Sequence, residues 1–370
     1  MTQPYLLLTP GPLTTSDTVR AAMDRDVSTW DADYNQITQQ LRADLVTLAQ
    51  ADCHDYAAVL LQGSGSYAVE ATIQTALPRT GAKLMIAVNG AYGRRMAEIA
   101  DYLAVPHVVV EIDETKPFAL PLIEATLTRH PDVTHFAIVH CETTTGVLNP
   151  IEAIIPALHA RGLITIVDAM SSFAGVPIPT AALGIDYLIS SANKCLQGVP
   201  GFGFVIARRA VIAQTAGNAR SLALDLYDQL ATMEAHAGKW RFTSPTHVVL
   251  AAAQAMKELQ AEGDVRARNQ RYAANQHRLA AGMQALGFEL IVAPAAQSPI
   301  ITSFKYPTPD FDFAAFYAFT KAHRFVIYPG KVARIPSFRI GNIGAVQLAD
   351  IERLLTVVAE AQAALAPAAG

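Results

Sequence analysis

The sequence predicts an α/β protein in two parts: a large domain around a doubly wound, mostly parallel sheet, and a smaller C-terminal α+β domain. Three observations carry this prediction. Between residues 57 and 210, short apolar runs alternate with segments of helical length and pattern. These runs do not alternate strictly with polar residues, which is typical of parallel strands covered on both faces. After about residue 260 the alternation stops, and short strands follow two long helices.

The elements can be placed in order along the chain. Strands of the large domain are predicted at residues 57–61, 83–88, 107–112, 134–139, 163–167, 187–189 and 202–207. Helices are predicted at residues 67–77, 92–103, 248–262 and 266–286. Short strands of the small domain are predicted at residues 288–292, 300–304, 325–328 and 337–340. We therefore expect an N-terminal arm at 1–20, a large domain at 21–259 and a small domain at 260–370.

Composition narrows the class of protein. Apolar residues make up 51% of the chain and charged residues 16%, and the net charge of −4 lacks the basic surplus of a nucleic-acid-binding protein. The basic pairs at 94–95 and 208–209 indicate only solvated surface charge. The sequence has three scattered cysteines. It has no histidine pair with metal-ligand spacing and no apolar run long enough to span a membrane. We expect a cytoplasmic protein without a signal peptide, metal, nucleic-acid partner or membrane partner.

Lys194 is the most informative single residue. It lies between the apolar runs 187–189 and 202–207, with a turn containing Pro200 and two glycines before the second run. A lysine held between buried strands is desolvated, which lowers the pKa of its amine and makes the amine available for carbonyl chemistry. Position alone leaves two interpretations open: a Schiff-base lysine and a lysine in a structural ion pair.

An anion site is predicted where the strand at 57–61 turns into the next helix. The residues Gly63 to Ser66 are small, so that backbone N–H groups and the helix dipole can face an anion, and the serine hydroxyls add donors. An ordinary turn is the alternative. Gly63, Gly65 and Ala68 also match the dinucleotide fingerprint of an NAD-dependent oxidoreductase. That fingerprint needs a carboxylate after the next strand, and residues 87–90 contain none.

Four other features stand at strand ends or in the small domain, each with a structural alternative. Asp168 ends an apolar strand and is either a helix cap or a fixed anion beside a cationic heterocycle. Residues 143–145 either cap a turn or donate to a phenolate-like oxygen. Tyr92 either packs in the hydrophobic core or places an aromatic ring at a ligand-binding site. Arg339, in an apolar strand, either forms an interdomain salt bridge or captures a carboxylate or phosphonate.

These features form a joint pattern. Open α/β sheets bind ligands at the carboxyl ends of their strands, where the anion site, Asp168 and Lys194 are all predicted to lie. Pyridoxal phosphate needs each of them: a site for its phosphate, an acidic partner for its pyridine nitrogen and a lysine for its aldehyde. The sequence therefore predicts a pyridoxal-phosphate site.

Longer strings around these residues point to a family. They are residues 6–15, 61–70, 142–146, 167–172, 189–195, 239–247, 325–331 and 338–344. In these strings the chain resembles the class V aminotransferases of the fold type I pyridoxal-phosphate enzymes, and the resemblance covers nearly the whole sequence. Within the class it is strongest to enzymes that transfer the amino group of 2-aminoethylphosphonate to pyruvate.

The resemblance implies roles for individual residues. Lys194 and Asp168 would be catalytic, Lys194 bonding to the cofactor aldehyde and Asp168 keeping the pyridine nitrogen protonated. Arg339 would hold the substrate carboxylate. Thr243 would reach the cofactor phosphate from a neighbouring subunit, so that the active site would require a homodimer. The other implied cofactor contacts are the phosphate-binding Ser64, Gly65 and Ser66, the ring-facing Tyr92 and Met170, and Thr144 or Thr145 at the ring oxygen.

The implied activity is transamination of 2-aminoethylphosphonate with pyruvate, giving phosphonoacetaldehyde and L-alanine. An alanine–glyoxylate or serine–pyruvate aminotransferase would share the same core residues and stays open as the alternative. The contact to the phosphonate is unassigned, and its candidates are Lys331, Arg241, Thr15, Ser16 and Trp30.

Overall fold

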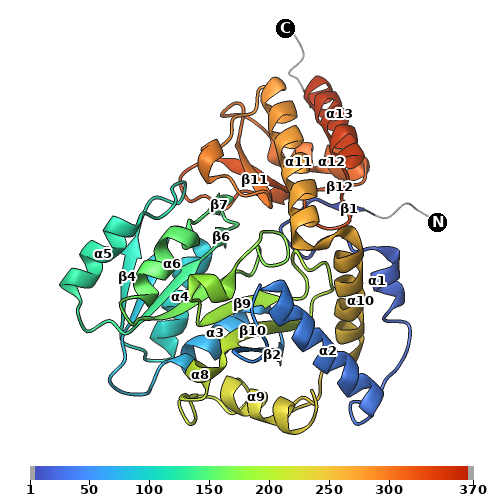
Figure 1. The fold of residues 1–370 in the computed structure, drawn as a ribbon. Helices are drawn as coiled ribbons and strands as arrows, with labels where there is room; N and C mark the ends of the chain where they lie inside the picture. The colour runs from blue at the N-terminus through green and yellow to red at the C-terminus, as the bar shows by residue number, and fades with distance from the viewer. Residues whose placement is uncertain (1–4, 366–370) are drawn as a thin grey trace.

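A seven-stranded sheet forms the centre of the molecule in the computed structural model, which describes residues 5–365 (Figure 1). Its strands, in spatial order, are β2 (Tyr56–Gln62), β10 (Phe202–Arg208), β9 (Tyr187–Ser191), β8 (Ile164–Asp168), β5 (His135–Val139), β3 (Leu84–Val88) and β4 (His107–Glu111). Strand β10 is antiparallel to both neighbours, and the other pairs are parallel. Residues 192–201 are too few for a helical crossover, so β10 must run antiparallel to β9. The predicted mostly parallel sheet is confirmed.

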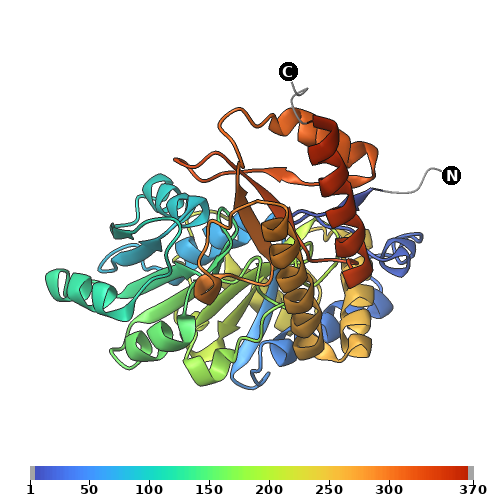
Figure 2. The same cartoon turned by 90° about the horizontal axis from the view of Figure 1, so that it is seen from above.

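Helices cover both faces of this sheet, and an apolar cluster lies under each layer (Figure 2). One layer contains α2 (Ala32–Leu48), α5 (Leu120–Arg129), α6 (Ile151–His159) and α10 (Thr246–Glu262). The other contains α3 (Gly65–Ala76), α4 (Ala91–Tyr102) and α9 (Leu226–Ala235). Along β2, Leu60 packs in the first cluster and Val59 in the second, because successive side chains point to opposite faces. Both faces are therefore apolar, as the unalternating runs predicted.

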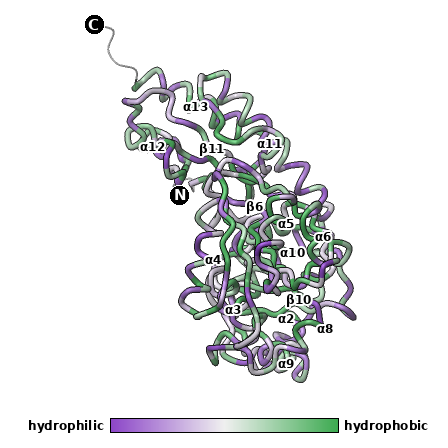
Figure 3. Tube along the Cα trace, turned by 90° about the vertical axis from the view of Figure 1, so that its left-hand side faces the viewer, coloured by the Kyte–Doolittle hydropathy of each residue, from purple (hydrophilic) through white to green (hydrophobic). Residues whose placement is uncertain are grey.

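The C-terminal part has its own small sheet, and Figure 3 places its strand β11 above β10 of the large sheet. Its strands are β11 (Ile301–Lys305), β14 (Ser337–Gly341) and β13 (Tyr328–Pro329), and its helices are α11 (Asp264–Ala285), α12 (Phe313–Ala322) and α13 (Leu348–Leu365). A phenylalanine-rich cluster fills the space between them. Within residues 5–365 no helix is long and apolar enough to cross a membrane.

Two details of the small part differ from prediction. The strand expected at 288–292 is reduced to an isolated bridge between Leu290 and Phe304, because Pro294 starts a short 3-10 helix (Pro294–Ala296) soon after it. The strand expected at 325–328 is two strands in different sheets, β12 (Phe325–Val326) and β13. The remaining elements are α1 (Asp17–Ala21), β6 (Cys141–Glu142), β7 (Val147–Leu148), α7 (Thr180–Leu183) and α8 (Arg209–Ile212).

The N-terminal segment connects the two parts. Its strand β1 (Leu6–Leu7) pairs in parallel with β12, and Leu8 packs in the small core, whereas Leu13 packs in the core of the large sheet. Helix α11 likewise reaches both cores, through Tyr272 and Leu279. The boundaries at residues 20 and 259 stay a prediction, and residues 1–4 and 366–370 of the outer segments lie outside the described residues.

Candidate active site

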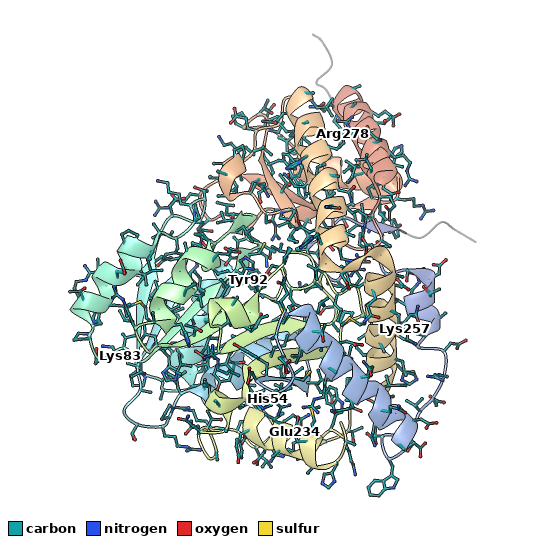
Figure 4. The ribbon with its side chains drawn as sticks, viewed as in Figure 1. His54, Lys83, Tyr92, Glu234, Lys257 and Arg278 are labelled. Carbon is teal, nitrogen blue, oxygen red and sulfur yellow. The ribbon has the colours of Figure 1, made fainter. Side chains whose placement is uncertain are left out.

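One cavity of about 300 Å³ brings together many of the predicted site residues. It lies at the carboxyl ends of strands β2, β3, β8 and β9, each of which is followed there by a loop or a helix. Figure 4 labels Tyr92, the second residue of α4. The predicted residues that line the cavity are Ser64, Gly65, Ser66, Tyr92, Asp168, Met170 and Lys194.

Lys194 follows β9 and forms no ion pair within residues 5–365. Its Nζ donates hydrogen bonds to the carbonyl oxygens of Pro10 at 3.0 Å and Gly11 at 3.2 Å. Asp186, the acidic residue nearest in sequence, instead lies 3.3 Å from Arg208 and accepts from the backbone of Thr165. Burial lowers the pKa of Lys194 to about 8. The amine is therefore largely available in neutral form in mildly alkaline solution.

The contact between Lys194 and residues 10–12 was missed by sequence reasoning. Gly11 has a φ of +106°, and a Cβ built on it would lie 2.6 Å from Cδ of Lys194. Pro12 lines the cavity beside it. The Pro-Gly-Pro segment is visible in the sequence, but Lys194, the residue that it contacts, is more than 180 residues away in the chain.

The predicted anion site has the geometry of an open helix N-terminus. Within the described residues, the backbone N–H groups of Gly65 and Ser66 have no acceptor; the first bond of α3 runs from Tyr67 to the Ser64 carbonyl at 3.0 Å. The Ser64 hydroxyl does not cap the helix. A Cβ on Gly65 would lie 2.3 Å from the sulfur of Met170, so a side chain there would displace the cavity wall. These free donors suit a phosphate group.

The two carboxylate oxygens of Asp168 have different surroundings, and its predicted role beside a cationic heterocycle stays a prediction. One carboxylate oxygen, Oδ1, accepts a hydrogen bond from the Met170 N–H at 2.8 Å, which caps the turn. The other, Oδ2, has no donor among residues 5–365, although Asp168 is only 4% exposed and lines the cavity. Burial raises the pKa of this carboxyl to about 6. A cationic ring nitrogen would satisfy the free oxygen and favour the ionised form.

Arg339, on β14, bonds to carbonyl oxygens instead of a carboxylate. Its Nε donates to Pro329 at 3.0 Å and its Nη1 to Thr143 at 2.7 Å, which joins the small part to the large one. No ion pair with Asp or Glu is formed within the described residues, so the expected salt bridge of the structural alternative is absent there. Burial is the largest cause of the lowered pKa of Lys194; Asp168 opposes it, and Lys331 and Arg339 add smaller lowering effects. This concentration of positive charge suits an anionic substrate.

Three predicted cofactor contacts do not line the cavity. The Thr144 hydroxyl donates to Glu142 at 2.6 Å and accepts from the Ala91 N–H at 3.1 Å, and the Thr145 hydroxyl accepts from the Val147 N–H at 3.4 Å. Both hydroxyls thus serve the turn, and their role at the ring oxygen stays a prediction. Thr243 is exposed, two residues before the N-cap of α10.

Glu142 is a buried carboxylate that sequence reasoning did not single out. It accepts hydrogen bonds from the backbone N–H groups of Tyr92 at 3.1 Å and Thr144 at 3.0 Å, as well as from the Thr144 hydroxyl. Burial raises its pKa. Gly90 packs against it so closely that a Cβ would lie 2.3 Å from Cδ of Glu142. Glu142 therefore caps the first turn of α4 and fixes the backbone of Tyr92 at the cavity.

Comparisons with known proteins show the family of this chain. The family described as "Aminotransferase class-V" matches residues 14–323. A protein of Lactiplantibacillus plantarum called 2-aminoethylphosphonate–pyruvate transaminase is 61% identical over 98% of this chain and 99% of its own. One of Vibrio vulnificus with the same name is 56% identical over 98% of both chains. A solved alanine–glyoxylate aminotransferase from Nostoc sp. superposes with a TM-score of 0.88 at 23% identity, covering 98% of this chain and 96% of its own.

The fold and the buried lysine define a pyridoxal-phosphate enzyme of fold type I. The chain belongs to the class V aminotransferase family. Its residues fit the cofactor: the free N–H groups at Gly65 and Ser66 fit the phosphate, the unbonded Asp168 oxygen fits the ring nitrogen, and the unpaired amine of Lys194 fits the aldehyde.

The lowered pKa of Lys194 predicts a pH-dependent stability in the cofactor-free protein. Between the folded pKa of about 8 and the unfolded value of 10.5, the unfolded chain holds a proton that the folded chain has lost. The free energy of unfolding should therefore rise with pH in this window, by up to about 3 kcal/mol. Urea unfolding of the wild type and of Lys194→Met, measured from pH 7 to pH 10, tests this. The free energy of unfolding of the wild type should rise with pH relative to that of Lys194→Met; a difference between the two proteins that stays constant with pH would contradict the lowered pKa.

Proposed function

We propose that this protein transfers the amino group of 2-aminoethylphosphonate to pyruvate, producing phosphonoacetaldehyde and L-alanine. The observation that carries the chemistry is the buried Lys194 amine, which has no carboxylate partner within residues 5–365 and shares one cavity with Asp168 and the open N-terminus of α3. The choice of substrates is supported by the 54–61% identity to enzymes of that name over nearly the full chain. The NAD-dependent interpretation has no support from these relatives.

Each residue has a defined task in this proposal. Bound pyridoxal phosphate supplies an aldehyde for the amine and a ring that accepts electrons. Lys194 Nζ would take the proton from the amine-bearing carbon of the donor and deliver it to the carbon that carried the cofactor aldehyde, because an amine with a lowered pKa is available as a base in mildly alkaline solution. Asp168 holds a proton on the ring nitrogen through its free oxygen. The reverse sequence with pyruvate gives L-alanine.

Substrate anions require positive charge at two distances from the reacting carbon. Pyruvate carries its carboxylate on that carbon, whereas 2-aminoethylphosphonate carries its phosphonate one carbon further out. We propose that Arg339 holds the pyruvate carboxylate, since its guanidinium is buried among carbonyls and unpaired with acid in the described structure. Lys331, near enough to act on Lys194, is the candidate that the charges favour for the phosphonate.

We also propose a homodimer with shared active sites. Thr243 is exposed, Phe242 beside it is 51% exposed, and Trp30 is 78% exposed under the Lys239 ammonium at 3.8 Å. Exposed aromatic side chains of this kind are typical of subunit interfaces. Sedimentation analysis should give twice the chain mass; a monomer that is fully active would contradict the shared site. The three free cysteines support a reducing compartment, and we propose the cytoplasm.

The substrate proposal is tested by the first half of the reaction. Each amine is mixed in turn with the holoenzyme, and the loss of the visible absorption band of the bound cofactor is followed in time. We expect 2-aminoethylphosphonate to react at least about tenfold faster than L-serine, L-alanine or glycine at equal concentration, because its dianion gains a contact that the others lack. If L-serine or L-alanine reacts as fast, the alanine–glyoxylate or serine–pyruvate assignment replaces this one.

A further inference from the structure

Arg95 is exposed, as the sequence indicated for the pair 94–95, but its surroundings differ from those of Arg94. Arg94 meets that expectation, because its guanidinium pairs with Glu111 at 2.8 Å and Glu114 at 3.1 Å. Arg95 lines the cavity instead and forms no ion pair within residues 5–365. Two neighbouring arginines of one helix thus differ in their partners: Arg94 is paired with carboxylates, whereas the exposed Arg95 has no carboxylate partner among the described residues and lies at the cavity.

The position of Arg95 is fixed by two contacts inside the candidate site. Its Nη1 lies 3.3 Å from the hydroxyl oxygen of Ser66, the second residue of α3. Its guanidinium carbon lies 5.2 Å from the centre of the Tyr92 ring, in the range of a cation–π interaction. Arg95 stands one helical turn after Tyr92 on α4, so both side chains lie on the same side of that helix. The guanidinium is therefore held beside the free N–H groups of α3.

Without Arg95, the positive charge at this end of the cavity would be too small to neutralise a phosphate group. A phosphate ester carries nearly two negative charges at neutral pH, whereas a helix N-terminus offers about half a positive charge and hydroxyl groups offer none. Apart from Lys194, Arg95 is the only lysine or arginine among the described residues that line the cavity. Lys194 is engaged by the carbonyls of Pro10 and Gly11. A guanidinium beside Ser66 supplies the missing charge and two further donors.

We propose that Arg95 is a further cofactor-binding residue, whose guanidinium neutralises the phosphate group held at the N-terminus of α3. The proposal rests on the pyridoxal-phosphate site and on no particular amino donor. A tetrahedral dianion could also come from the phosphonate of the substrate, which has the same chemistry. The contact to Ser66 favours the cofactor phosphate, because Ser66 belongs to the helix end with the free N–H groups.

The test compares two ligands that differ only in the phosphate. Cofactor-stripped protein is titrated with pyridoxal phosphate and with pyridoxal, and the dissociation constants are measured by absorbance. Both ligands can bond to Lys194, so the ratio of their dissociation constants isolates the contribution of the phosphate. The variants are Arg95→Ala and Arg95→Lys, with Arg94→Ala as the matched control on the same helix. Circular dichroism confirms that each variant is folded.

Arg95→Ala should raise the dissociation constant of pyridoxal phosphate about tenfold and leave that of pyridoxal within about twofold. Arg95→Lys should fall between this variant and the wild type, and Arg94→Ala should change neither constant. An equal loss for both ligands would overturn the proposal and place the effect in Tyr92. Unchanged constants with a raised KM for 2-aminoethylphosphonate would also overturn it and assign Arg95 to the substrate phosphonate. Because no amino donor is present in the titration, a wrong donor assignment does not affect the result.

Discussion

Replacing Lys194 with alanine should lower the rate of transamination by at least about 10⁴-fold, because the change removes both the covalent attachment point and the proton carrier. No other amine among the described residues lining the cavity can take over, since the only other basic side chain there is the guanidinium of Arg95. The rate is measured as L-alanine formed from 2-aminoethylphosphonate and pyruvate, with the cofactor in excess.

Two controls separate chemistry from folding in this experiment. Lys194→Arg keeps the positive charge and the donors to the Pro10 and Gly11 carbonyls, but its guanidinium cannot act as a base, so it should be as inactive as the alanine variant. Added methylamine should restore part of the activity of Lys194→Ala by supplying a small amine. Near-normal turnover by either variant would end the assignment of Lys194 as the catalytic amine.

Sequence reasoning selected residues of the candidate site that lie together in the structure, because the signals for them are local. Lys194 stands between two apolar runs, Asp168 ends a third, and Gly63 to Ser66 follow a fourth. Buried parallel strands are recognisable from their apolar content, and the residue after such a strand must lie at the carboxyl edge of the sheet. The structure brings these residues to one cavity for that reason.

The features that sequence reasoning missed depend on contacts between distant segments. Glu142 reaches the start of α4, which lies 50 residues earlier in the chain than its own turn. The carbonyl of Pro10 meets Lys194 across 184 residues, and Arg95 is distinguished from Arg94 only by which neighbours α3 and β4 place beside them. No periodicity or motif encodes such pairings. The predicted strand at 288–292 was wrong. Its apolar pattern is a local signal, but a strand also needs pairing with a distant segment, and here Leu290 and Phe304 form only an isolated bridge.

The proposed roles of Asp168 predict that its substitution will also lower the rate of transamination strongly. Asp168→Asn should lower kcat by about 10²–10³-fold at pH 8, because the amide can no longer stabilise a positive charge on the ring nitrogen. The asparagine side-chain oxygen can still accept the hydrogen bond from the Met170 N–H, so the turn should persist. Asp168→Ala removes the cap as well, and its extra loss of unfolding free energy, about 1 kcal/mol, measures the cap alone.

The pH dependence of cofactor binding should follow the same carboxyl group. Because burial raises the pKa of Asp168 to about 6, the group is ionised at pH 8 and becomes protonated as the pH falls through 6. Wild-type affinity for pyridoxal phosphate should therefore weaken below about pH 6, whereas the affinity of Asp168→Asn should lack this component. Titrations of both proteins between pH 5 and pH 8, each at constant ionic strength, measure the difference. If Asp168→Asn keeps kcat within a few-fold of the wild type, the ring nitrogen has no need of a charged partner, and Asp168 serves only to hold the turn through Oδ1.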